Sequence, residues 1–97
     1  MNLYLLTQTV NRGYDTFDSC VVCAPNEDQA KTIHPYGDRH YVEGAGWVRS
    51  DFPEFTSAMN RVRDTVWATP ENITATLLGT ADPSVKVGVV LASFRNG

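Results

Sequence analysis

The densest group of chemically capable side chains lies near the N-terminus, between two apolar runs. Residues 12–19 hold two carboxylates, one guanidinium and three hydroxyls, namely Arg12, Tyr14, Asp15, Thr16, Asp18 and Ser19. Asp and Thr side chains commonly hydrogen-bond the backbone of their own turn, and a nearby Arg can pair with either carboxylate. A turn-stabilising role and a ligand- or partner-binding role therefore both stay open for this segment.

Asp15 and Asp18 are three residues apart. This pair of carboxylates gives the alternative interpretation of the chain as a small metal-assisted hydrolase. Two carboxylates carry no chemistry without the geometry to hold a metal or water between them. The chain has no Ser/His/Asp or Cys/His order and no glycine pattern of a phosphate-binding loop. We therefore expect a protein that is not an enzyme, and keep the hydrolase as the alternative.

A second polar group lies at the end of the last apolar run of the chain and consists of Ser93, Arg95 and Asn96. A rigid strand end is a favourable platform for a binding site. If this run pairs antiparallel with the strand expected over 17–24, its end lies beside Asp18 and Ser19. The two polar groups would then form one pocket.

Aromatic residues form the third candidate group, because aromatic rings can stack on a base or fill a partner's pocket. For Trp67 we favour a place in the core, whereas for Trp47 core packing and partner binding stay equally open. The group comprises Tyr36, Tyr41, Trp47, Phe52, Phe55 and Trp67.

Cys20 and Cys23 form a C-x-x-C, followed by His34 and His40 at spacings that approach a zinc-finger pattern. The central gap of ten residues is shorter than the usual roughly 12. The segment around the cysteines is β-branched and apolar, so it predicts a strand, on which Cys20 and Cys23 point to opposite faces. We expect two reduced thiols and no metal or other cofactor.

Alternating apolar residues predict the elements that position these groups. Two strands over 3–10 and 17–24 are joined by a Gly-containing turn and form a hairpin. Asn26 can cap a helix of about two turns that ends before Pro35. Further strands are expected over 65–67, 73–78 and 87–94, and the last, nearly continuous apolar run predicts a central strand buried on both faces.

The segment at about 36–66 predicts an irregular insertion, in which a hairpin has Trp47 and Val48 in its second arm and 56–63 forms helical turns. The resulting fold class is α+β. We expect one domain over residues 1–97 with a mainly antiparallel, four- to five-stranded sheet and one short helix on one face, in the order β-β-α-insertion-β-β.

The composition limits the class of partner. The net charge of −3 argues against a nucleic-acid binder, which needs a surplus of Lys and Arg. Six arginines against two lysines leave a small anionic ligand open, because Arg binds carboxylates and phosphates well. No apolar run reaches the roughly 18 residues of a membrane span. The start of the chain does not resemble a signal peptide, so we expect the cytosol.

The segments Gly13–Ser19 with Val21-Val22, Asn26–Pro35 and Gly88–Phe94 resemble a group of short uncharacterised proteins encoded in phage and prophage genomes. In that group the Ser-Phe pair is followed by Asn, whereas here Arg95 precedes Asn96. The resemblance implies an accessory protein in the host-cell cytosol that binds and inhibits or sequesters a host defence factor, or a small nucleotide signal. A homo-oligomeric structural accessory protein is a further alternative, since small domains with exposed β edges tend to self-associate.

Overall fold

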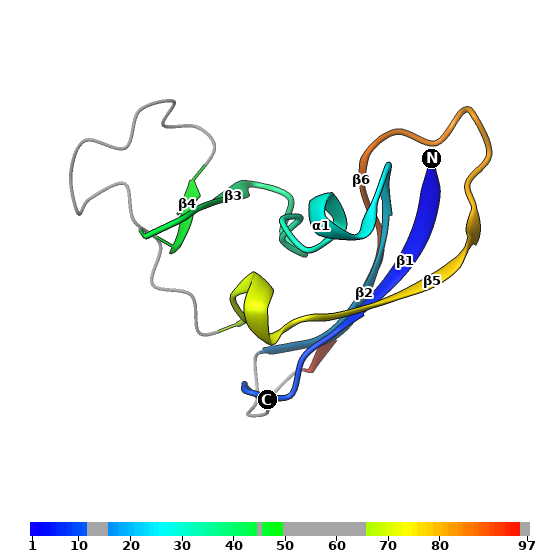
Figure 1. Ribbon diagram of the computed structural model, residues 1–97. Helices are drawn as coiled ribbons and strands as arrows, with labels where there is room; N and C mark the ends of the chain where they lie inside the picture. Colours follow the sequence, from blue (N-terminus) through cyan, green and yellow to red (C-terminus); the bar gives the residue numbers. More distant parts are fainter. Residues whose placement is uncertain (12–15, 45, 50–65, 96–97) are drawn as a thin grey trace.

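The computed structural model describes residues 1–11, 16–44, 46–49 and 66–95 (Figure 1). The predicted first turn at 12–15, the helical turns over 56–63, and Phe52 and Phe55 lie outside the described residues. No described helix is long and apolar enough to cross a membrane.

The main sheet has four strands in the order β5-β1-β2-β6, and every neighbouring pair is antiparallel. These strands are β1 (Asn2–Thr7), β2 (Thr16–Ala24), β5 (Thr74–Thr80) and β6 (Gly88–Arg95). The α+β class, the antiparallel sheet and the order β-β-α-insertion-β-β are therefore confirmed. The predicted hairpin, β1 with β2, lies at the centre of the sheet.

Side chains of the central hairpin alternate between two faces, as the apolar pattern requires. Tyr4 and Leu6 of β1 lie on the same face as Cys20 and Val22 of β2, and all four are buried. This inner face carries the core, with Phe17, Ala24, Ala30, Trp47, Trp67, Ala68 and Ile73 completing the cluster.

β1 ends at Thr7, three residues before the predicted end of the strand, because the side chain of Gln8 organises the chain that follows. Its Oε1 accepts from the backbone N–H groups of Val10 at 3.0 Å and Asn11 at 2.9 Å. Its Nε2 donates to the carbonyls of Asn11 and Phe17, both at 2.8 Å. Buried Gln8 thus ties the exit of β1 to the start of β2.

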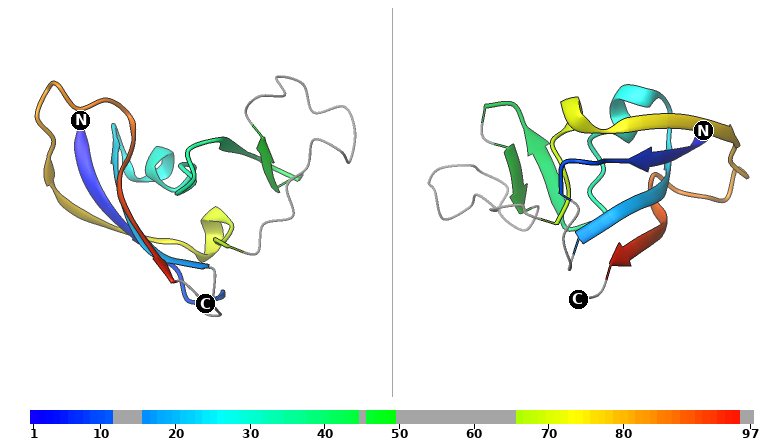
Figure 2. Two further views of the ribbon diagram at one scale, coloured as in Figure 1. Left: turned by 180° about the vertical axis from the view of Figure 1, so that it is seen from behind. Right: turned by 90° about the horizontal axis from the view of Figure 1, so that it is seen from below.

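The α-helix of the described chain, α1 (Glu27–Ala30), lies on the inner face of the sheet (Figure 2). It begins as predicted, since the side chain of Asn26 accepts from the backbone N–H of Gln29 at 2.9 Å. It has one turn and not two, because the backbone continues with the shorter three-residue spacing: Thr32 N–H donates to Gln29 and Ile33 N–H to Ala30. Ala30 is fully buried against the sheet.

A second, two-stranded sheet confirms the hairpin predicted inside the insertion. Its strands are β3 (Arg39–Val42) and β4 (Gly46–Arg49). Trp47 and Val48 lie in the second arm and are buried. The indole N–H of Trp47 donates to the carbonyl of Ala68 at 3.0 Å, which connects this hairpin to the segment that leads through the short 3-10 helix η2 (Pro70–Asn72) into β5.

Two strand predictions are wrong. Val66 and Trp67 form a bend and not a strand. The last strand, β6, is not central and buried on both faces, since it lies at the edge of the sheet with Val90 51% and Leu91 68% exposed. A continuous apolar run does not distinguish a central strand from an edge strand, because that position depends on which strands pair.

Replacement of Gln8 tests its role in the hairpin. Gln8→Leu would leave buried backbone groups without partners, so we expect the free energy of unfolding to fall by about 2–3 kcal/mol. The same substitution at exposed Gln29 should change it by less than about 0.5 kcal/mol. Urea denaturation of both variants measures the difference, and equal losses would contradict the assignment.

Candidate functional site

The structure brings the described members of the two predicted polar groups to the same end of the sheet. β2 and β6 are antiparallel, with Ser19 opposite Ser93 and Thr16 opposite Arg95. The predicted proximity of the last strand's end to the start of the second strand is therefore confirmed. Arg12, Tyr14, Asp15 and Asn96 lie outside the described residues, so their roles stay predictions.

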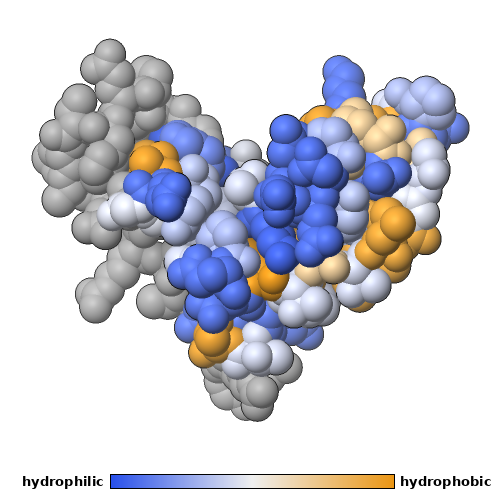
Figure 3. All heavy atoms as spheres, in the orientation of Figure 1, coloured by the Kyte–Doolittle hydropathy of each residue, from blue (hydrophilic) through white to orange (hydrophobic). Residues whose placement is uncertain are grey.

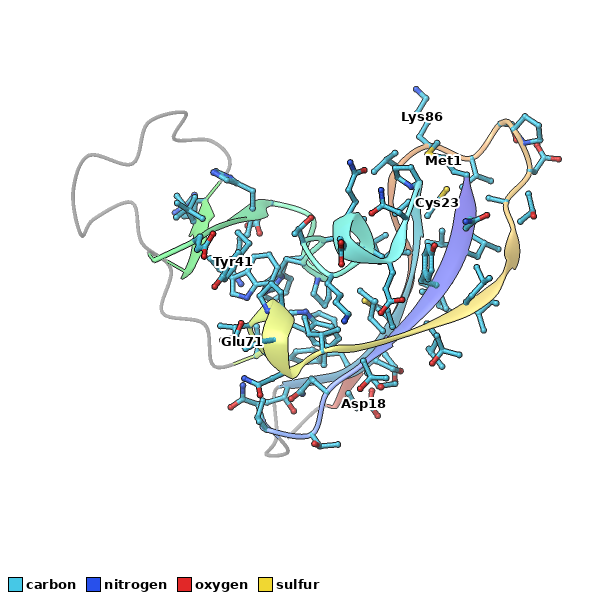
Figure 4. The ribbon with its side chains drawn as sticks, in the orientation of Figure 1. Met1, Asp18, Cys23, Tyr41, Glu71 and Lys86 are labelled. Atoms are coloured by element: carbon cyan, nitrogen blue, oxygen red, sulfur yellow. The ribbon has the colours of Figure 1, made fainter. Side chains whose placement is uncertain are left out.

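Asp18 is an extra residue in β2 at this end of the sheet. Phe17 pairs with Phe94 and Ser19 pairs with Ser93, which leaves Asp18 without an opposite residue in β6. Such a β-bulge redirects side chains and is common near functional sites. Asp18 is exposed, and Figure 4 shows it at the lower end of the sheet, beside the end of β6.

The register creates a row of four hydroxyl side chains across all four strands, which the sequence analysis did not predict. Thr7 lies opposite Thr74 on one side and Ser19 on the other, and Ser19 lies opposite Ser93. These residues share the outer face of the sheet, opposite the core. At roughly 4.8 Å between strands, this hydroxyl row extends over about 14 Å.

A second row runs parallel to the first, two residues away on each strand and nearer the middle of the sheet. It contains Thr76, Leu5, Val21 and Leu91, which pair in that order. Thr76 and Leu91 are exposed, whereas Leu5 and Val21 are partly buried. We call this the aliphatic row. None of the eight side chains in the hydroxyl and aliphatic rows is charged.

Among the described elements, the outer face is covered only beyond the aliphatic row. α1 packs on the opposite face, where Ala30 joins the core. Cys23 continues the outer face and is fully buried, and its Sγ lies 3.8 Å from the carbonyl of Val85 in the segment between β5 and β6. No described element packs on the two rows.

Trp47, a predicted binding residue, lies in the core with 2% of its surface exposed. Its indole ring contacts the rings of His34 at 5.0 Å and Tyr41 at 5.5 Å between centroids. This burial leaves almost no surface for a partner. The expected core position of Trp67 is confirmed, since it is fully buried.

Tyr36 is the exposed member among the four described aromatic candidates, with 49% of its surface accessible. Its ring stacks on buried His34 at 5.6 Å, and the Arg39 guanidinium lies 4.7 Å from the ring centroid. The backbone N–H of Tyr36 also donates to Nδ1 of His34 at 3.1 Å. These contacts hold Tyr36 within the protein's own aromatic cluster.

The two cysteines are free thiols on opposite faces of β2, as predicted. Cys20 pairs with Leu6 on the inner face, and Cys23 pairs with Leu3 on the outer face. No group of three metal-ligating side chains occurs within the described ranges. Burial raises the pKa of the Cys20 thiol from 9.0 to about 12, because the charged thiolate is poorly solvated in the core.

No protein-family model, curated protein or solved structure matches the chain.

The raised pKa of Cys20 predicts a loss of stability in alkali. Between pH 9 and about 12 the unfolded thiol loses its proton while the folded thiol keeps it, so base favours the unfolded chain. Relative to Cys20→Val, wild-type stability should be constant below pH 9 and then fall by up to about 1.4 kcal/mol per pH unit. Denaturant unfolding at a series of pH values measures this difference, and parallel curves would contradict it.

Proposed function

We propose that the chain is a non-catalytic accessory protein that binds a protein partner through the outer face. One observation carries the proposal: a face with two rows of uncharged side chains, in which Leu91 is 68% exposed. The solvent face of an antiparallel sheet is usually polar. Aliphatic side chains and depletion of charge are typical of the centre of a protein–protein interface.

The hydroxyl row suits the same kind of partner. Its Ser and Thr side chains can donate and accept hydrogen bonds, and they flank the aliphatic row on a hydrogen-bonded sheet. Exposed Asp18 adds one charge at the margin. An apolar centre with a polar margin is the common arrangement of protein interfaces, and the rigid sheet lowers the entropy lost on binding.

A protein partner fits this face better than a small nucleotide. A phosphate-bearing ligand requires cationic side chains or clustered backbone N–H donors, and the two rows contain no cation. The resemblance to phage-encoded proteins supports a host protein, such as a defence factor, as the partner. The hydrolase alternative depends on Asp15, outside the described residues, and stays a prediction.

Two arginine substitutions on opposite faces test the proposal. Ser19→Arg places an unpaired charge in the middle of the hydroxyl row, whereas Gln29→Arg adds the same charge on α1, on the opposite face. A bulky charge at the polar margin costs less than one buried in the apolar centre, about 1.4 kcal/mol, so Ser19→Arg should weaken binding roughly 10-fold. Gln29→Arg should bind like the wild type.

Affinity capture from host-cell lysate identifies the bound protein, and calorimetry with that protein measures both variants. Equal binding by Ser19→Arg and wild type would exclude the outer face as the interface. A parallel thermal-shift screen with nucleotides should leave the melting temperature unchanged, because a tight ligand raises stability by mass action. A clear shift would favour a nucleotide-binding function.

A further inference from the structure

Each of the two edge strands of the main sheet has one side on which no described strand pairs with it. Among the described strands, β5 has only β1 as a neighbour and β6 has only β2. They have nearly equal lengths of seven and eight residues, and each exposes a leucine, Leu77 at 60% and Leu91 at 68%. Figure 3 shows hydrophobic atoms over β5, at the right-hand edge. Natural edge strands are commonly protected by lysine, proline or a β-bulge. Neither Lys nor Pro occurs in Thr74–Thr80 or Gly88–Arg95, and each strand has one bulge residue, Leu78 and Val90.

The strand directions allow these two edges to pair with each other in successive copies. Each strand of the order β5-β1-β2-β6 is antiparallel to its neighbour, so β5 and β6 run in opposite directions. When one copy is placed beside the next in the plane of the sheet, β6 of the first lies antiparallel to β5 of the second. The two edges lie on opposite sides of the sheet (Figure 2).

Charged residues at the strand ends complement one another in this arrangement. Acidic residues flank β5, with Glu71 before it and Asp82 after it, whereas β6 has Lys86 before it and Arg95 at its end. Antiparallel pairing places the end of β5 opposite the start of β6, so Asp82 faces Lys86 of the next copy. At the other end of the strands, the residue that precedes β5 by three positions is acidic (Glu71) and the last residue of β6 is basic (Arg95). Figure 4 shows Lys86 and Glu71 toward opposite ends of the sheet.

The same charges disfavour symmetric pairing. Two β6 edges would bring Lys86 opposite Arg95, and two β5 edges would bring Asp82 opposite Glu71. Both carboxylates are ionised at neutral pH, and hydrogen bonds from Ser84 and Thr69 lower the pKa of Asp82 and Glu71 respectively. Like charges directly opposite each other on paired strands are destabilising, so they act against both symmetric pairings.

We propose that copies of this chain associate head to tail, with β5 of one copy paired antiparallel to β6 of the next. The contact joins two different surfaces, so it generates a ring if the rotation between copies closes, and a filament if it does not. Successive outer faces then lie side by side along one continuous sheet. The proposal is independent of the proposed function, because it uses the strand edges and the charged strand ends.

A charge exchange between Asp82 and Lys86 tests the pairing. Asp82→Lys and Lys86→Asp each place like charges opposite one another, so each should weaken self-association about 5- to 30-fold. The double variant restores opposite charges and should associate like the wild type. Sedimentation velocity and light scattering over a concentration series measure the mass, which for wild type should rise above 10.7 kDa.

Mixing the two single variants is the decisive measurement. Contacts between like variants repel, whereas both kinds of contact between unlike variants place a lysine opposite an aspartate. An equimolar mixture should therefore regain head-to-tail association, with the two variants alternating and a mass above that of either variant alone. Asp82→Asn controls for the local turn, because its side-chain oxygen can still accept from the N–H and hydroxyl of Ser84, bonds of 2.9 and 2.7 Å. This control should weaken association less than Asp82→Lys does. A monomeric wild type, or single variants that associate normally and gain nothing on mixing, would overturn the proposal.

Discussion

The register of the central hairpin is the constraint on which the rest of the structure depends. With Leu6 opposite Cys20 and Thr7 opposite Ser19, the buried side chains of both strands face the core. The opposite face then carries the hydroxyl groups together with Leu5 and Val21. A shift by one residue would exchange the two faces completely. Gln8 secures this register, since its amide binds the turn residue Asn11 and the carbonyl of Phe17. The hydroxyl and aliphatic rows are consequences of the same alignment.

Aromatic contacts link this sheet to the small second hairpin. Phe94 of β6 contacts Phe17, which contacts Tyr36, which stacks on His34, which contacts Trp47 of β4; successive centroids are 4.8–5.6 Å apart. Edge-to-face and stacked rings at these distances add stabilisation beyond the burial of their area. Trp47 therefore serves the connection between the two sheets, which explains why an aromatic residue from a glycine-containing insertion is buried.

Local patterns in the sequence predicted most of the elements but not which strands are neighbours in the sheet. Alternation and turn residues predict the hairpin, the Asn26 cap and the opposite faces of Cys20 and Cys23. The antiparallel pairing of β2 with β6 was a hypothesis about topology, which the register confirms. The edge position of β6 does not follow from these patterns, because an apolar run is compatible with several pairings. The hydroxyl row could not be predicted either, since its members come from four strands whose register is set by non-local contacts. Within the hydroxyl row, the pairing of Thr7 with Ser19 follows from the predicted hairpin alone.

The sheet order also has a consequence for biosynthesis. The two outer strands attach to the central hairpin only after residues 25–73 have been made, because β2 ends at Ala24 and β5 begins at Thr74. A nascent chain that has completed its first hairpin thus lacks both lateral neighbours while most of the remaining polypeptide is translated. Contacts between residues so distant in sequence require closure of a long loop and slow the folding of a domain. Residues 74–95 therefore complete the four-stranded sheet by adding an edge strand on each side of the central hairpin.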